Sequence, residues 1–158
     1  MKKTYLLTPG PTPIPERVLQ SQAATIPHHR TPEFEKLFGA VQLSLQSLFQ
    51  TSQPVLTLAS SGTGAMEAAL VNLFSPGDRV ICLNAGKFGE RWVKLAKAYG
   101  LDPFEVRAPT GEALGKQDLE TARAQIVGPI AGVLFQANET STGVALPTQE
   151  ITQWCQEN

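Results

Sequence analysis

Short apolar runs alternate with amphipathic helical patterns along this chain, and no other feature limits its possible folds as much. Runs rich in Val, Ile, Leu and Phe predict strands at 55–59, 79–83, 103–108 and 131–137. Apolar residues spaced three and four apart predict helices that begin at Pro15 and at 148 and that span 31–48, 65–74, 88–100 and 116–125. Successive parallel strands need a crossover helix, so this order predicts an α/β fold with a mostly parallel sheet that helices cover on both faces.

The helix at 31–48 has the clearest pattern. Thr31 and Pro32 suit its cap and first turn. Apolar side chains recur along one face, at Phe34, Leu37, Phe38, Val41, Leu45 and Leu48. We predict that this face is buried in the core.

Composition is typical of an ordinary globular protein. The 158 residues are 42% hydrophobic and 17% charged with a net charge of -1, so no basic surface favours nucleic acid or an anionic membrane. Prolines interrupt the apolar run near the N-terminus, which suits neither a signal peptide nor a membrane span and predicts a cytoplasmic protein. Cys82 and Cys155 have no cysteine or histidine at a metal-binding spacing, so we predict reduced thiols and no metal site.

Three loops follow predicted strands and are expected to form the functional site. They span 60–64, 84–88 and 138–143. Parallel strands end at the same edge of a sheet, and ligands of such sheets bind beyond the carboxyl ends of the strands. We therefore expect these loops to lie together.

The loop at 60–64, "SSGTG", leads directly into a helix and suits an anion. The first N–H groups of a helix have no partner within it and carry a partial positive charge. A dinucleotide would need a third glycine where Glu67 stands, and a nucleoside triphosphate would need a Gly-Lys-Ser/Thr sequence that the loop lacks. The Thr63 hydroxyl and the N–H groups of Gly64 and Ala65 therefore suit a single phosphate. An ordinary strand-to-helix turn remains the alternative.

Five motifs resemble, in order and spacing, those of class V aminotransferases, which are fold-type I pyridoxal-phosphate enzymes. They are "LLTPGPTPIPERV", "HHRTPEF", "SSGTGAMEAALVNL", "NAGKFGERW" and "ANETSTGVALP". The branch they resemble most is that of the alanine–glyoxylate and serine–pyruvate aminotransferases. The resemblance implies that the anion is the phosphate of pyridoxal 5'-phosphate. It also implies that the sheet is the N-terminal part of the large domain of the fold-type I transferases.

The resemblance implies a role in cofactor binding for five residues. Thr63, Gly64 and Ala65 would bind the phosphate, Ala65 through its backbone N–H alone. Phe88 would stack on the pyridine ring, an offset aromatic contact worth roughly 1 kcal/mol. The Thr140 hydroxyl would donate a hydrogen bond to the phenolic oxygen. Without the resemblance, Phe88 would be assigned to the core and the loop of Thr140 to a polar turn.

Other residues resemble parts of the family's substrate site. Gly10 resembles a glycine that lines the substrate pocket, where a small amino acid approaches the backbone. Asn138 could assist Thr140. His29 and Arg30 resemble a pair that, in a phosphoserine-specific branch, reaches the neighbouring subunit's substrate, and a surface pair beside a helix start is equally compatible with the sequence.

A domain organisation also follows from the resemblance. Residues 1–30 would form an N-terminal arm with a short helix, and 31–158 an incomplete cofactor-binding large domain without the small C-terminal domain. The family's Schiff-base lysine, the aspartate beside the pyridine nitrogen and the arginine that binds the substrate carboxylate correspond to segments beyond Asn158. We therefore expect a fragment with no catalytic residue and no activity of its own, unless a second fragment supplies the rest.

The implied parent protein is a homodimeric aminotransferase with small amino acids and 2-oxo acids as substrates, moving an amino group from alanine or serine to glyoxylate or pyruvate. Two alternatives stay open. Another class V branch would need features not evident here, namely added basic residues for a phosphoserine aminotransferase or a mobile nucleophilic cysteine for a cysteine desulfurase. The second alternative is a non-catalytic assembly partner that retains the phosphate pocket.

Overall fold

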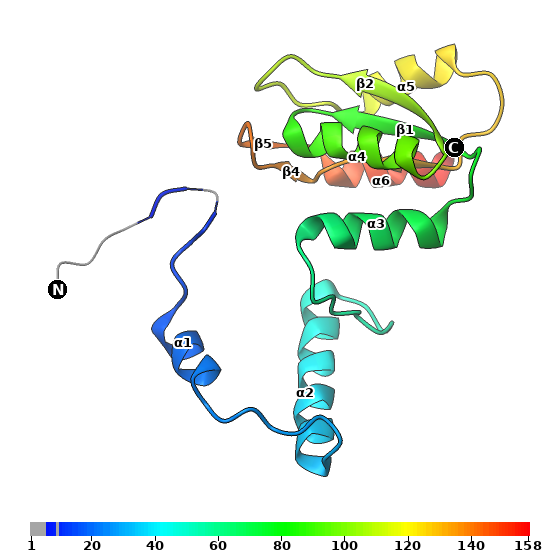
Figure 1. Cartoon of the computed structure of the whole chain (residues 1–158). Helices are drawn as coiled ribbons and strands as arrows, with labels where there is room; N and C mark the ends of the chain where they lie inside the picture. Colours follow the sequence, from blue (N-terminus) through cyan, green and yellow to red (C-terminus); the bar gives the residue numbers. More distant parts are fainter. Residues whose placement is uncertain (1–5, 9) are drawn as a thin grey trace. The chain divides into compact units, whose positions relative to one another are not determined.

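The computed structural model describes residues 6–8 and 10–158, which belong to two compact units, Met1–Ala59 and Ser60–Asn158. Figure 1 labels most of the elements of both units. Residues 1–5 and 9, which fall in the predicted N-terminal arm, lie outside the described part of the chain.

The first unit contains the helices α1 (Glu16–Gln22) and α2 (Pro32–Phe49). As predicted, α2 begins after Thr31, whose Oγ1 accepts a hydrogen bond from the Phe34 N–H at 3.3 Å. The helix ends at Gln50, which adopts the left-handed conformation with a φ of 51°. Capping residues at both ends therefore define the length of α2.

The prediction of a strand at 55–59 is wrong. A strand needs a neighbouring strand for its backbone hydrogen bonds, and none pairs with 55–59 among the residues that the structure describes. Instead, the Gln42 side-chain amide donates to the Val55 carbonyl at 3.0 Å, and that of Gln46 donates to the Gln53 carbonyl at 3.2 Å. Side chains of α2 therefore hold the returning segment in place of a strand ladder.

The apolar face of α2 is not the buried core that its pattern predicts. Leu37 is 53% exposed, Phe38 48% and Leu48 74%. A helix face becomes core only where another element packs on it. Within the described part of this unit, α1 and the extended segments leave most of the face uncovered.

The second unit is built on a parallel sheet, as predicted. β1 (Arg79–Asn84) lies in the centre, between β2 (Asp102–Arg107) and β3 (Gly132–Leu134). Val80 of β1 is in register with Pro103 on one side and Gly132 on the other.

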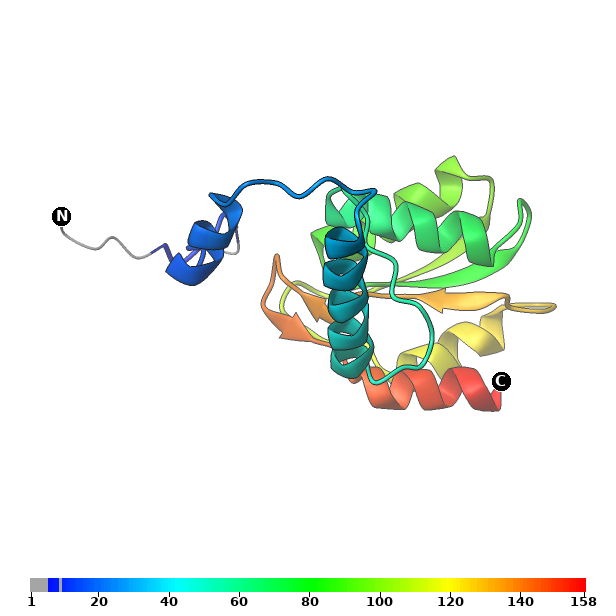
Figure 2. The same cartoon turned by 90° about the horizontal axis from the view of Figure 1, so that it is seen from below.

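Helices cover both faces of this sheet (Figure 2). One face carries α3 (Gly62–Leu73) and α4 (Lys87–Ala98), and the other α5 (Lys116–Gln125) and α6 (Thr148–Glu157). Successive side chains of β1 point to opposite faces. Val80 and Cys82 therefore join the core under α3 and α4, whereas Ile81 and Leu83 join the core under α5 and α6. This burial on both faces explains why the strand sequence is continuously apolar.

The segment after β3 folds differently from the prediction. β3 ends at Leu134, before the predicted end at residue 137. Two further strands, β4 (Asn138–Glu139) and β5 (Val144–Ala145), pair antiparallel around the predicted loop. Strands of two residues are too short to show an alternating pattern, so the sequence carried no signal for them.

Candidate functional site

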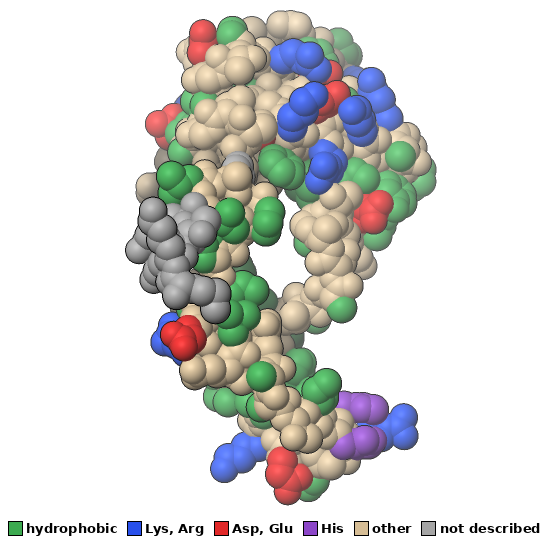
Figure 3. Space-filling model, turned by 60° about the vertical axis from the view of Figure 1, so that its left-hand side comes forward, with side chains coloured by type: hydrophobic (Ala, Val, Ile, Leu, Met, Phe, Trp, Pro, Cys, Tyr) green, Lys and Arg blue, Asp and Glu red, His purple; other side chains and the backbone are tan. Residues whose placement is uncertain are grey.

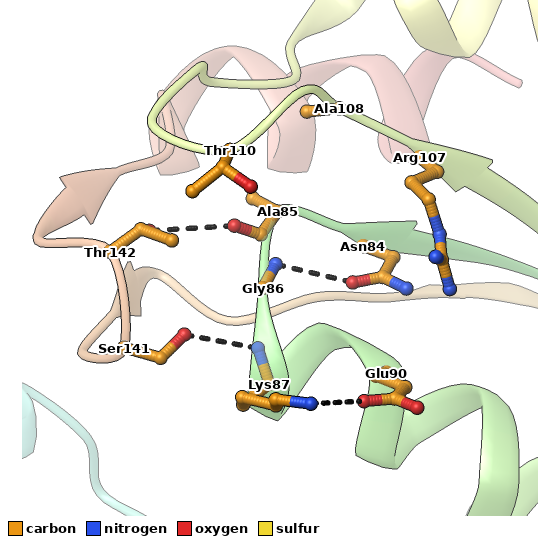
Figure 4. Close-up of a pocket in the computed structure, with 10 residues that line it drawn as sticks. All are labelled: Asn84, Ala85, Gly86, Lys87, Glu90, Arg107, Ala108, Thr110, Ser141 and Thr142. Atoms are coloured by element: carbon orange, nitrogen blue, oxygen red, sulfur yellow. Dashed lines mark hydrogen bonds and ion pairs between the residues drawn. The ribbon is translucent and has the colours of Figure 1, made fainter.

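Hydrogen bonds bring the three predicted loops together at the carboxyl edge of the sheet. The Lys87 N–H, at the start of α4, donates to Ser141 Oγ at 3.0 Å and joins the second loop to the third (Figure 4). Arg91 of α4 donates to Thr63 Oγ1 at 2.8 Å and joins α4 to the first turn of α3. The site can therefore be described within the second unit alone.

The first turn of α3 has the features of an anion-binding helix start. It contains no acidic residue, and no described side chain caps it. The Gly64 N–H donates to the Ser61 carbonyl at 3.0 Å. The N–H groups of Gly62 and Thr63 precede any hydrogen bond of the α-helical pattern and are the donors left for a ligand. A Cβ at Gly64 would come within 2.1 Å of Ser60 Oγ, so this glycine lets Ser60 pack against the turn.

Arg91 adds a positive charge to this helix start. Its Cζ lies 5.1 Å from the centre of the Phe88 ring, a distance typical of a cation–π contact. Within the described part of the chain, no carboxylate lies within 4.0 Å of its guanidinium. Arg91 was not among the site residues predicted from the sequence. Its position three residues after Phe88, on the same face of a helix, was the available signal.

Two of the residues predicted to bind phosphate, Thr63 and Gly64, are half-buried, and Ala65 is exposed. Because Arg91 donates to Thr63 Oγ1, the Thr63 hydroxyl keeps its own proton for another acceptor. Phe88 is half-buried in the first turn of α4. Arg91 contacts both Thr63 and Phe88, so the predicted phosphate-binding hydroxyl and the predicted stacking ring share one guanidinium as a neighbour.

Glu139 of β4 is a fully buried carboxylate and was not among the predicted site residues. Its Oε2 accepts hydrogen bonds from the Phe88 N–H at 3.1 Å and the Gly89 N–H at 2.9 Å. Its Oε1 accepts from the Ser141 N–H at 3.2 Å and from Ser141 Oγ at 2.6 Å. Glu139 therefore caps the N-terminus of α4 from a distant part of the chain.

Burial raises the pKa of the Glu139 carboxyl, but the hydrogen bonds from Ser141, Gly89 and Phe88 outweigh burial and hold its pKa below the usual value. The carboxyl is therefore ionised at neutral pH. An anion already occupies the start of α4, whereas the start of α3 has none among the described residues.

Thr140, predicted to contact the phenolic oxygen, is exposed, and its hydroxyl has no hydrogen-bond partner in the described ranges. The neighbouring hydroxyls are engaged: Ser141 bonds Glu139, and Thr142 Oγ1 donates to the Ala85 carbonyl at 3.4 Å (Figure 4). Asn138, predicted to assist, is exposed in β4.

Close packing at the β1–α4 junction requires two glycines. A Cβ at Gly89 would lie 2.7 Å from the Asn84 Cα, a backbone atom. A Cβ at Gly86 would lie 2.5 Å from Ser141 Oγ and 2.7 Å from Glu139 Cδ. Small residues therefore let α4 and the loop after β4 approach the end of β1.

A pocket of about 340 Å³ lies beside this site, at the ends of β1 and β2 (Figure 4). Asn84 and Arg107 line it, and both bond Glu105 Oε1, at 2.6 Å from Asn84 and 2.9 Å from Arg107. The hydrogen bond from Asn84 is the main reason that the pKa of Glu105 lies below its usual value. None of the predicted cofactor-binding residues lines this pocket, and its arginine is already neutralised. The hydroxyl, guanidinium and aromatic ring of Thr63, Arg91 and Phe88 therefore indicate the candidate site better than this pocket does.

Gly10, predicted to line the substrate pocket, belongs to the first unit and is exposed there. His28 and His29, the chain's two histidines, stack with ring centres 4.8 Å apart (Figure 3). His29 and Arg30 line a hollow of about 480 Å³ together with Phe34 and Phe38 of α2.

The described ranges contain neither a cluster of metal ligands nor a membrane-spanning helix. No group of three His, Cys, Asp or Glu side chains there could hold a metal ion. No helix of that part is long and apolar enough to cross a membrane.

A parallel sheet covered by helices on both faces is the fold of the fold-type I aminotransferases. The chain belongs to the family Aminotransferase class-V, whose model matches residues 4–158.

Two relatives and one solved structure illustrate this membership. The soluble hydrogenase 42 kDa subunit of Anabaena cylindrica is 43% identical over 90% of the chain and 37% of that protein. Alanine–glyoxylate aminotransferase of Rattus norvegicus is 34% identical over 97% of the chain and 37% of that protein. The crystal structure of alanine–glyoxylate aminotransferase from Nostoc sp. matches with a TM-score of 0.88 at 33% identity, over 99% of the chain and 42% of that structure. The chain therefore spans less than half the length of these proteins.

Proposed function

We propose that the protein is a pyridoxal-phosphate-dependent aminotransferase that moves an amino group from alanine or serine to glyoxylate or pyruvate. The cluster of Thr63, Arg91 and Phe88 carries this proposal, because it brings a hydroxyl at the start of α3 together with a cation and an aromatic ring of α4. These groups match the phosphate and the ring of the cofactor. Relatives named serine–glyoxylate and alanine–glyoxylate aminotransferase support the choice of substrates.

The donors of this chain fit a phosphorylated aromatic cofactor. A phosphate needs a helix start without a carboxylate, and α3 offers one whereas α4 is capped by Glu139. The Thr63 hydroxyl and the N–H groups of Gly62 and Thr63 would hold the phosphate. The predicted donor Gly64 would contribute only by releasing the Ser61 carbonyl, to which its N–H donates at 3.0 Å. Phe88 would lie against the ring.

Bound pyridoxal phosphate supplies an electron sink for the bonds at the α-carbon of an amino acid. The residues of this chain would bind and orient it. Arg91 would balance one charge of the phosphate. The free hydroxyl of Thr140 would donate to the phenolic oxygen and favour its ionised form, and Gly10 would leave room for the substrate.

We assign no proton-transfer residue to this chain. Lys87, the lysine nearest the site in sequence, is exposed and lies 3.5 Å from Glu90, with which it forms an ion pair. The lysine that binds the cofactor covalently is proposed to lie in another part of the protein. The proposed enzyme is a cytoplasmic homodimer, in which residues 1–30 form an arm and 31–158 an incomplete large domain that a further segment or a second fragment completes.

A spectral titration of the full-length protein tests this function. Pyridoxal phosphate should bind with a visible absorption band. Alanine or serine should convert that band to the spectrum of the pyridoxamine form, and glyoxylate or pyruvate should restore it. A full-length protein that binds no pyridoxal phosphate would refute the function, and one that binds it but responds to no small amino acid would refute the substrates.

A second candidate is a subunit that contributes to an assembly without catalysis. The name of the Anabaena cylindrica relative, a soluble hydrogenase subunit, favours it. Native mass spectrometry of the protein purified from its own cells distinguishes the two: a homodimer supports the aminotransferase, and a stable complex with other polypeptides supports the subunit.

A further inference from the structure

Glu139 receives more hydrogen bonds than any other carboxylate of the site, and its side chain is fully buried. The four donors come from two segments far apart in the sequence. The N–H groups of Phe88 and Gly89 belong to the first turn of α4, and the N–H and Oγ of Ser141 belong to the turn after β4. One carboxylate therefore holds both segments.

These two segments carry the residues proposed to contact the ring side of the cofactor. Phe88 is held through its own backbone N–H. Thr140 lies between Glu139 and Ser141, which bond each other on either side of it at 2.6 Å. Ser141 Oγ also accepts from the Lys87 N–H at 3.0 Å, so a second contact joins the segments.

We propose that Glu139 is a positioning residue that fixes the Phe88 ring and the Thr140 hydroxyl relative to each other. This inference rests on the proposed function. Both oxygens of the carboxylate accept hydrogen bonds, so the network needs a group with two acceptors. An amide of the same shape has one acceptor oxygen, and its NH2 group would face N–H donors.

The variant Glu139→Gln tests this role in the full-length protein, with pyridoxal phosphate and pyridoxal as probes. Both ligands share the ring and the phenolic oxygen, so Glu139→Gln should weaken both by at least about tenfold, the equivalent of one hydrogen bond to a charged group. The visible absorption maximum of the bound cofactor should also shift, because a displaced Thr140 hydroxyl no longer stabilises the ionised oxygen. A residue that serves overall stability alone would not change this spectrum.

Glu90→Gln is the matched control. Glu90 also lies in the first turn of α4, but its partners are Lys87 and Lys94, and it does not join α4 to the turn after β4. This control should bind both ligands within about twofold of the wild type. A Glu139→Gln protein with the affinity and spectrum of Glu90→Gln would overturn the inference, and so would a loss confined to pyridoxal phosphate.

Ser141→Ala covers the case in which Glu139→Gln does not fold. It removes the hydroxyl that donates to Glu139 and accepts from the Lys87 N–H, and it leaves Phe88 and Gly89 bonded to Glu139. A shifted absorption maximum in Ser141→Ala supports the inference, and an unchanged one contradicts it. Failure of the wild-type protein to bind either ligand would instead refute the proposed function.

Discussion

Replacing Arg91 by glutamine should weaken the binding of pyridoxal phosphate and leave that of pyridoxal unchanged. The Arg91 guanidinium donates to Thr63 Oγ1 at 2.8 Å and, in the described residues, has no carboxylate within 4.0 Å, so its charge is available to an anion at the start of α3. A hydrogen bond that involves a charged group contributes about 1.5–3 kcal/mol. Arg91 is half-buried, and solvent screening favours the lower end. A loss of about 1.5 kcal/mol raises the Kd roughly tenfold.

The assay is a spectral titration of the full-length protein and its variants with each ligand. Arg107→Gln is the control, because Arg107 is already paired with Glu105 at 2.9 Å and lies on the β2 side of the site. This variant should bind both ligands like the wild type. The two ligands differ only in the phosphate. An equal loss for both in Arg91→Gln, or no loss for pyridoxal phosphate, would therefore refute the reasoning.

Three further predictions concern stability and reactivity. Gly89→Ala should lower the free energy of unfolding by about 1–3 kcal/mol, because its Cβ would overlap backbone atoms. Gly39 lies in α2 with open space around it, so Gly39→Ala should raise the free energy of unfolding by up to about 1 kcal/mol. Denaturant titration of both variants measures these changes, and equal effects would contradict close packing at Gly89. The pKa of Glu139 is lower in the folded state than its usual 4.5, so its carboxylate contributes stability above about pH 4.5 that is lost as pH falls through the folded-state pKa. Glu139→Gln should therefore reduce the pH dependence of the free energy of unfolding in denaturant titrations. An identical pH profile in the wild type and the variant would argue against this contribution. Burial raises the pKa of Cys82 to about 12, whereas Cys155 is exposed. An aromatic disulfide reagent should therefore label Cys155 in the native protein and Cys82 only after unfolding. Fast labelling of both thiols in the native protein would contradict the burial of Cys82 in β1.

The sequence predicted the elements of the second unit well because their signals are local. The apolar run of β1 reflects burial on two faces of a sheet, and α5 has the predicted bounds, 116–125. The resemblance to a family identified Thr63, Phe88 and Thr140, and their roles stay predictions. Without that resemblance, Phe88 would have been assigned to the core, because aromatic side chains are mostly buried and nothing else in the sequence distinguishes a core ring from one that stacks on a cofactor.

Local patterns were misleading where the outcome depended on a partner. The run at 55–59 has the composition of a strand, but no described strand pairs with it. The stripe along α2 has the spacing of a core face, but Leu37 and Leu48 are more than half exposed. Composition and spacing indicate that a segment could pair as a strand or bury a helix face. Whether it does so depends on another element that lies against it.

By itself, then, the sequence determined the six helices that the structure describes, the three strands of the parallel sheet and the loops at its carboxyl edge, because periodicity, capping and turn residues act over a few neighbouring positions. Only the tertiary structure decided that Arg91 meets Thr63 across 28 residues and that Glu139 caps α4 across 50. These contacts depend on how the helices and loops pack on the sheet. No short stretch of sequence encodes that packing. The partner of a charged residue on a helix or in a turn can therefore be identified only in the folded chain.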